Sequence, residues 1–278
     1  MAQRPLTQQG YWPHTANINF CEPDYEVTHY VAEFWNAASS IPMILTGVFG
    51  ILLARQQKLG AEQALSYFGV GIVGCGSLAF HGTLMRTGQV LDEIPMLWGV
   101  LMLLYCAYQH AVERRRRLEG GASANAPTPT RLLVLRGVLL FYALSATGVY
   151  FSFGFDIFIL LYGVSVACLV LGAFYAIFTA TPPTGAEPRR LMRAAALSYV
   201  GGVVAFWLPS ELLCDSVPLL QRLPLHAIFH LTSAAGPHLG LTAFAFARFE
   251  HERPKAPPSL WFAGLPAIDR GAALHKQV

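Results

Sequence analysis

Seven long stretches of this chain contain no Asp, Glu, Lys or Arg, and this feature constrains the fold more than any other. They cover residues 34–54, 63–85, 94–112, 137–155, 157–186, 194–210 and 223–247. Each is close to the ~20 residues that an α-helix needs to cross the ~30 Å hydrocarbon core of a bilayer. Backbone groups in lipid must be hydrogen-bonded within the segment, and the stretches do not alternate as barrel strands would. The sequence therefore predicts an all-α integral membrane protein, a seven-transmembrane-helix bundle.

The composition excludes several other classes of protein. Hydrophobic residues make up 54% of the 278 positions and charged residues only 13%, whereas soluble domains carry roughly 25% charged residues. A disordered chain, a secreted disulfide scaffold and an ordinary soluble enzyme are ruled out. The net charge of +3 is too small to indicate a nucleic-acid partner. The Arg114–Arg117 run is better interpreted as a stop-transfer signal than as a patch for nucleic acid or anionic lipid.

Lys and Arg are distributed unevenly between the two sides that seven spans create. The N-terminal segment and the even-numbered connections hold only three of the 19 basic residues, Arg4, Arg86 and Arg222. Because cytosolic loops are enriched in Lys and Arg, the N-terminus is predicted to be lumenal or extracellular and the C-terminus cytosolic. We divide the chain into a lumenal segment (1–28), a seven-helix transmembrane domain (29–248) that carries the candidate site, and a disordered cytosolic tail (249–278).

Two cysteines fall on the predicted outer side of the membrane. Cys21 lies in the N-terminal segment and Cys214 in the connection before the last span. A pair on an oxidising face can form a disulfide, although the sequence alone does not fix the geometry that such a bond needs.

Ionisable residues at membrane depth are costly and are therefore candidates for function. His226 and His230 lie four residues apart, so they project from one face of the last helix and can share one metal ion. His81, at the same outer level, can supply a third ligand. Three protein ligands plus a water form the pattern of a catalytic zinc site. Ser77 shares a face with His81, and Asp92 follows as a general base or as a partner that orients an imidazole.

Other interpretations of these residues stay open. A single histidine in a membrane helix often only hydrogen-bonds a neighbouring helix, and the His226–His230 pair could hold a haem. Asp92 could be an N-terminal helix cap, a position that Asp favours. A retinal protein is excluded, because the three lysines lie outside the spans and no Schiff base can form within the bundle.

Oxygen donors are concentrated in the N-terminal segment. Within fifteen residues it carries Asn19, Glu22, Asp24, Glu26 and Glu33. Hard oxygen ligands suit calcium, although the glycine and ligand spacing of an EF-hand are absent. The other interpretation is a solvated acidic face whose carboxylates cap helices.

Three blocks of sequence carry a family resemblance. The first is Asn19-Phe-Cys-Glu-Pro-Asp-Tyr-Glu-Val-Thr-His-Tyr-Val-Ala-Glu-Phe-Trp-Asn36. The second is His81-Gly-Thr-Leu-Met-Arg-Thr-Gly-Gln-Val-Leu-Asp-Glu-Ile-Pro-Met-Leu-Trp98, and the third is Leu225-His-Ala-Ile-Phe-His230. On these blocks the chain resembles the alkaline ceramidase family, seven-span hydrolases in a broader group that includes the adiponectin receptors. The resemblance extends over essentially residues 10–250.

The resemblance implies an intramembrane zinc-dependent amidase that hydrolyses ceramide, phytoceramide or dihydroceramide from the bilayer to a sphingoid base and a free fatty acid. It implies zinc ligands at His81, His226 and His230, and catalytic roles for Ser77 and Asp92. It implies a calcium site on Asn19, the backbone carbonyl of Phe20, Glu22, Asp24 and Glu33. It also implies a Cys21–Cys214 disulfide and, in a eukaryote, residence in the endoplasmic reticulum or Golgi. The alternatives are a zinc receptor of the adiponectin-receptor type and a haem-binding membrane redox protein.

The chain departs from the family pattern at a few positions. Asn19 and Asp24 exchange the usual Asp and Asn, which keeps three carboxylates, so we expect calcium binding to persist. Ser210 and Glu211 stand where the family often has Asp and Asn, and His238 stands where an aromatic residue is common. We expect these last changes to affect substrate preference more than chemistry.

Overall fold

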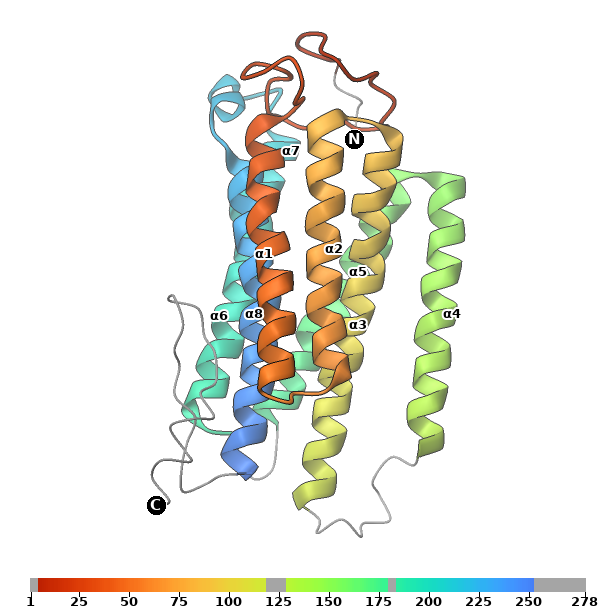
Figure 1. The fold of residues 1–278 in the computed structure, drawn as a ribbon, viewed down its shortest axis with the longest axis vertical. Coiled ribbons are helices and arrows are strands. Elements are labelled where there is room, and N and C mark those ends of the chain that lie inside the picture. Colours follow the sequence, from red (N-terminus) through yellow and green to blue (C-terminus); the bar gives the residue numbers. More distant parts are fainter. Residues whose placement is uncertain (1–4, 119–128, 180–183, 253–278) are drawn as a thin grey trace.

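The computed structural model describes residues 5–118, 129–179 and 184–252, and the regular elements in these ranges are helices. In chain order they are α1 (Phe34–Gln56), α2 (Ala61–Thr83), α3 (Arg86–Leu118), α4 (Pro129–Phe153), α5 (Phe155–Phe178), α6 (Ala186–Gly202), the π-helical turn η1 (Val203–Trp207), α7 (Leu208–Leu212), the 3₁₀ turn η2 (Pro218–Arg222) and α8 (Leu225–Glu252). The long helices run side by side (Figure 1). Most of the predicted tail, residues 253–278, lies outside the described residues.

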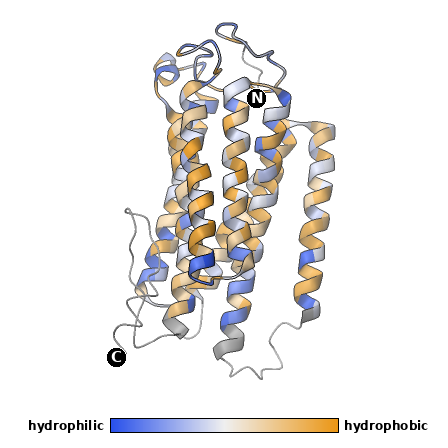
Figure 2. Cartoon of the chain, viewed as in Figure 1, coloured by the Kyte–Doolittle hydropathy of each residue, from blue (hydrophilic) through white to orange (hydrophobic). Residues whose placement is uncertain are grey.

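Six helical segments are long and apolar enough to cross a membrane, and they coincide with the first six predicted spans. They are α1, α2, Arg86–Arg114, Thr130–Phe153, α5 and Ala186–Leu212, the last of which joins α6, η1 and α7. Apolar residues cover the shafts of these helices (Figure 2). The prediction of an all-helical membrane bundle is therefore confirmed in these terms. The remaining long helix, α8, is not among these six segments, and it carries His226, His230 and His238.

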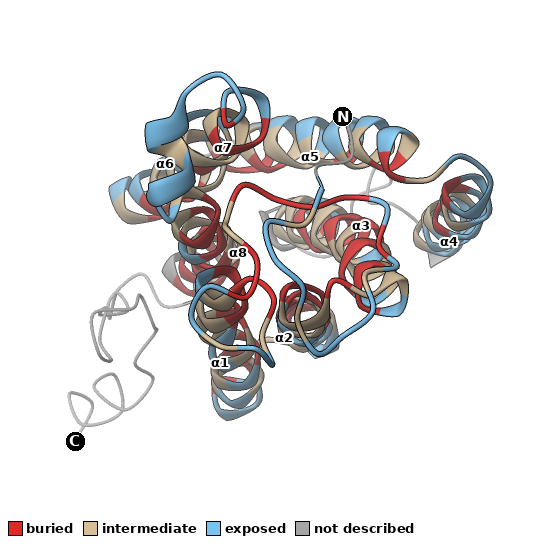
Figure 3. Ribbon diagram, turned by 90° about the horizontal axis from the view of Figure 1, so that it is seen from above, coloured by how far each residue is buried: buried red, intermediate tan, exposed pale blue. Residues whose placement is uncertain are grey.

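The outer surface of the bundle is apolar, as a lipid-facing surface requires. Phe141, Leu171 and Leu197 are among the most exposed side chains, at 73%, 71% and 76% of their accessible area. Figures 1 and 3 show α4 at the edge of the molecule, separated from α1, α6 and α8 by the other helices. α8 packs mainly against α6 and α1, and α2 packs between α1 and α3.

One glycine sets the distance between α2 and α3 at the level of the candidate site. A Cβ atom at Gly76 would lie 1.9 Å from the carbonyl oxygen of Leu91 and 2.7 Å from the backbone nitrogen of Asp92. Only a glycine permits this approach, as is common where membrane helices pack closely. The contact brings Asp92 beside the turn of α2 that carries Ser77.

The N-terminal segment forms a cap over one end of the bundle (Figure 3). The backbone N–H groups of Thr15 and Ala16 donate to the carbonyl of Leu84, and that of Glu33 donates to the carbonyl of His81 at 2.8 Å. The predicted disulfide is present between Cys21 and Cys214, with a Cα–Cα distance of 5.9 Å. The segment is thus attached both to the end of α2 and to the chain that leads into α8.

The sixth span changes its helical geometry near the site. In η1 the N–H of Leu208 donates to the carbonyl of Val203, five residues back, instead of the usual four. Pro209 follows directly, and a proline ring clashes with the carbonyl four residues before it in a regular α-helix. The wider π turn accommodates Pro209 and continues into α7, which carries Ser210 and Glu211.

Candidate metal and catalytic site

Three histidines converge beneath the N-terminal cap. His81 lies in the last turn of α2, while His226 and His230 lie in the first two turns of α8. One ring nitrogen of each lies within 4.8 Å of the others, and all three side chains are buried. The structure therefore brings together the three residues that the sequence selects as metal ligands.

Two of these imidazoles are oriented by α1 and by the residue that precedes it. Nδ1 of His81 contacts a carboxylate oxygen of Glu33, and this pair is fully buried. Nδ1 of His230 lies 3.1 Å from the carbonyl oxygen of Asn36, an acceptor to which it donates. Nδ1 is thus occupied in both rings, which leaves Nε2 as the atom that can bind a metal. Nε2 of His81 is buried without a hydrogen-bond partner, as expected of a ligand atom.

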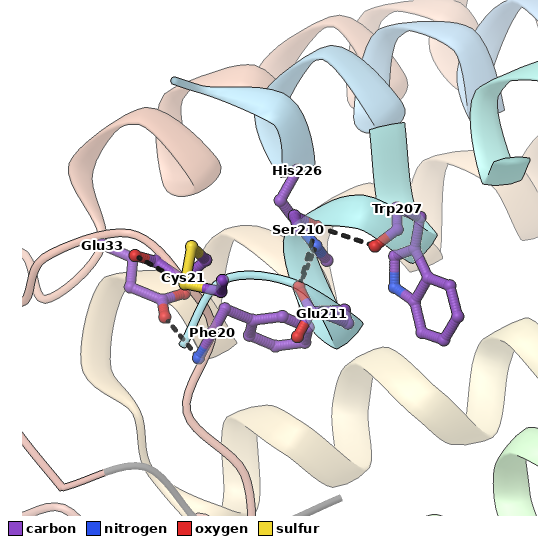
Figure 4. The surroundings of a disulfide bond; sticks show 8 residues. Phe20, Cys21, Glu33, Trp207, Ser210, Glu211 and His226 are labelled. Carbon is purple, nitrogen blue, oxygen red and sulfur yellow. Dashed lines mark hydrogen bonds and ion pairs between the residues drawn. A yellow bond between two sulfur atoms is a disulfide. The ribbon is translucent and has the colours of Figure 1, made fainter. Parts of the chain in front are cut away.

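His226 is oriented by the end of the sixth span. Its Nδ1 lies 3.4 Å from a carboxylate oxygen of Glu211, and Ser210 donates a hydrogen bond to the same carboxylate at 3.0 Å. Figure 4 shows these residues beside the Cys21–Cys214 disulfide. Each of the three imidazoles therefore has an acceptor at or near Nδ1. This arrangement of three buried imidazoles fits a zinc ion.

Ser77 and Asp92 line the same cavity as His226 and His230. The cavity has a volume of about 650 Å³ and extends along the bundle between α2, α3, α5, α6 and α8, with a mostly apolar wall. Ser77 accepts a hydrogen bond of 2.9 Å from the hydroxyl of Ser40 on α1. Asp92 lies in the second turn of α3, not before its first residue, so the alternative of an N-terminal cap is wrong.

The acidic residues of the N-terminal segment have different partners. Glu22 accepts hydrogen bonds from the backbone N–H groups of Trp35 at 2.6 Å and Asn36 at 2.8 Å, so it caps α1 as the alternative interpretation expects. One oxygen of Asp24 accepts from the N–H of Thr7 and the side chain of Asn19, at 2.8 and 3.2 Å. Its other oxygen is buried without a hydrogen bond.

The carboxylates of this segment nevertheless lie close enough to repel one another. Burial, together with the nearby charges of Glu33 and Asp24, raises the pKa of Glu22 to about 7. Burial likewise raises the pKa of Glu33 to about 8. Among the described residues, these carboxylates do not approach one another as closely as the histidine nitrogens do. Phe20 contributes its backbone N–H, which donates to Glu33 at 3.0 Å.

Several residues of the site were not selected from the sequence. Asn36 and Ser40 are polar positions on one face of the first span, and Glu211 is noted only as a departure from the family pattern. The structure places Glu211 against His226, so this departure lies beside a candidate metal ligand. These three polar side chains share burial in or beside an apolar span, and sequence alone does not reveal burial.

The comparisons with known proteins all find ceramidases. The family model described as Ceramidase matches residues 12–269. Alkaline ceramidase 3 of Mus musculus is 28% identical over 274 residues, which cover 95% of this chain and 96% of the relative. An alkaline ceramidase of Arabidopsis thaliana is 25% identical and covers 92% of this chain and 93% of its own length. Alkaline ceramidase YPC1 of Saccharomyces cerevisiae is 25% identical, with 88% and 79% covered.

Proposed function

The chain belongs to the Ceramidase family, and we propose that it is an intramembrane zinc-dependent amidase that hydrolyses ceramide-type lipids to a sphingoid base and a free fatty acid. The observation that carries this proposal is the shared cavity. Two of the converging histidines, Ser77 and Asp92 all line one mostly apolar space. Such a space can accept two hydrocarbon chains while the polar groups at one end act on the amide.

A zinc ion held by His81, His226 and His230 would polarise the amide carbonyl and make water at the site more acidic. Asp92 accepts the proton of the attacking water as the water oxygen bonds to the carbonyl carbon. When the C–N bond breaks, Asp92 returns that proton to the leaving amine nitrogen, so the carboxylate is unchanged at the end.

Ser77 stabilises the negative charge that develops on the carbonyl oxygen. In this role the Ser77 hydroxyl donates to the carbonyl oxygen of the substrate, while its own oxygen accepts from Ser40, 2.9 Å away. An oxyanion donor of this kind contributes about 3 kcal/mol to transition-state stabilisation.

The proposal includes the orientation of the protein in the membrane. We infer that α8 is a seventh span, that the N-terminal cap faces the lumen or exterior, and that the C-terminus is cytosolic. The charge distribution supports this orientation, and a disulfide in the cap agrees with an oxidising side. In a eukaryotic cell the endoplasmic reticulum or Golgi provides such a side.

Calcium is proposed for the cap, with Asn19, the Phe20 carbonyl, Glu22, Asp24 and Glu33 as ligands. The repulsion among the carboxylates and the unpaired oxygen of Asp24 support it, since a divalent cation relieves both. The ion would brace the cap and do no chemistry.

Turnover of a labelled ceramide by the purified protein, combined with metal analysis, tests the proposal. His81→Ala should lose both zinc and hydrolysis. His29→Ala, which removes an exposed histidine of the cap, should keep both. A receptor of the adiponectin-receptor type would hold zinc without turnover, and a haem protein would show a Soret band instead of zinc.

A further inference from the structure

A second carboxylate lines the cavity beside Asp92. Glu93 is the next residue of α3, its side chain is only 2% exposed, and it forms part of the cavity wall. Neither the metal site nor the proton transfer proposed above uses it. A buried carboxyl group in an apolar wall is costly unless it has a partner, so its presence requires an explanation.

One oxygen of Glu93 is held by a short chain of hydrogen bonds. The side-chain amide of Gln89 donates to Oε1 of Glu93 at 2.9 Å. Gln89 is itself fixed, because its oxygen accepts from the backbone N–H of Asn17 in the cap at 2.9 Å. The cap thus orients Glu93 through Gln89.

The other oxygen, Oε2, is buried and makes no hydrogen bond of normal length. The Tyr150 hydroxyl lies near enough to interact with Glu93, yet it also lacks such a bond. Leaving a buried acceptor in this state has a cost in stability. A ligand hydroxyl that donates to Oε2 would remove that cost.

We propose that Glu93 binds a hydroxyl group of the substrate next to the scissile amide. This inference rests on the proposed ceramidase function. In ceramides the carbon that bears the amide nitrogen is flanked by two carbons with hydroxyl groups. Since Asp92 acts on the amide, the adjacent Glu93 is placed to accept from one of these hydroxyls. Glu93 is therefore a specificity-determining residue for hydroxylated sphingoid bases.

The protein should discriminate strongly between a substrate that carries this hydroxyl group and an analogue that lacks it. A site built to hydrogen-bond a substrate hydroxyl disfavours an analogue that lacks it, because the buried partner is then left unpaired. A hydrogen bond to a charged acceptor contributes roughly 1.5–3 kcal/mol, which corresponds to about 10-fold to 100-fold in kcat/KM. An amide acceptor in place of the carboxylate should lose about 10-fold of this preference.

The test compares three substrates with the same acyl chain: ceramide, its 1-deoxy analogue and its 3-deoxy analogue. The wild type should prefer ceramide over one of the two analogues by at least about 10-fold, and that analogue identifies the hydroxyl bound. Glu93→Gln should lower kcat/KM for ceramide about 10-fold and leave the disfavoured analogue nearly unchanged, with zinc content as in the wild type.

Tyr150→Phe provides the matched variant, because Tyr150 is near Glu93 but outside the cavity wall. It should preserve the substrate preference. The proposal is overturned if the wild type hydrolyses all three substrates equally. It is also overturned if Glu93→Gln and Tyr150→Phe slow all three alike, since Glu93 would then serve only a structural water or Tyr150. If the wild type hydrolyses none of them, the ceramidase function itself fails.

Discussion

Glu33→Gln tests whether the cap and the proposed zinc site form one hydrogen-bonded unit. Glu33 accepts on both oxygens: Oε1 from the N–H of Phe20, and Oε2 from His81 and from the side chain of Asn36 at 3.3 Å. A glutamine has one acceptor oxygen and one donor NH₂ group. Whichever way it turns, an N–H of the protein faces the NH₂ group in a fully buried position.

The expected losses of stability and of zinc affinity in Glu33→Gln follow from this unpaired N–H group. A buried donor without a partner costs about 1–3 kcal/mol, and loss of a group that orients a metal-bound histidine weakens metal binding by about 10-fold to 100-fold. We expect zinc affinity to fall within that range. A loss of about 2 kcal/mol would lower the melting temperature by about 4–8 °C in a domain of this size.

The assay is a competition between the purified protein and a coloured zinc chelator, with a thermal melt on the same sample. Glu187→Gln is the control, because Glu187 forms an exposed ion pair with Arg190 at 2.8 Å and such pairs contribute little. Unchanged zinc affinity in Glu33→Gln would refute the reasoning. If that variant loses only its response to calcium, Glu33 belongs to the calcium site alone.

Four further outcomes are expected. His226→Ala should abolish hydrolysis and reduce bound zinc, measured by metal analysis, because one of three ligands is lost. Asp92→Asn should keep zinc but lose most of the rate, since the amide is nearly isosteric and cannot take a proton; lost zinc would assign Asp92 a structural role. The pKa of Glu22 is raised to about 7, so the folded protein without calcium favours the protonated form, and its melting temperature should fall as pH rises from about 5 to 7. The rise in melting temperature on adding calcium should grow over the same pH range. A rise that does not depend on pH would contradict this. Cys21→Ser/Cys214→Ser should lower the melting temperature, because the covalent link between the cap and the chain before α8 is lost, and a reductant should have no further effect on that variant.

The helices could be predicted from sequence because most charged residues are solvated. A solvated charged residue lies outside the apolar core of the membrane, so it marks the end of a span. α1 spans 34–56 against a charge-free stretch of 34–54. The rule fails at α3, which begins at Arg86, eight residues before the charge-free stretch. Asp92 and Glu93 are buried inside that helix, so their charges do not mark a boundary.

The sequence predicted the candidate site only where the spacing of residues along a helix determines which way their side chains point. His226 and His230 must share a helical face, and the order of spans brings His81 to the same level. The groups that hold these rings could not be predicted, since Glu33 and Glu211 contact them only through tertiary packing. The family resemblance implies that Glu33 is a calcium ligand, whereas in the structure its side chain contacts His81.

The disulfide and the histidine cluster join residues from opposite ends of the chain, with consequences for biosynthesis. Cys21 and Cys214 are separated by 193 residues, which a ribosome needs roughly 10–40 s to synthesise at ~5–20 residues per second. His81 is synthesised during that time, but α8 and its two histidines are made only afterwards. The nascent chain can therefore neither fasten its cap nor assemble its proposed metal site. Under the proposed mechanism, ceramide in the membrane that receives the growing chain is not hydrolysed until the last helix has been made.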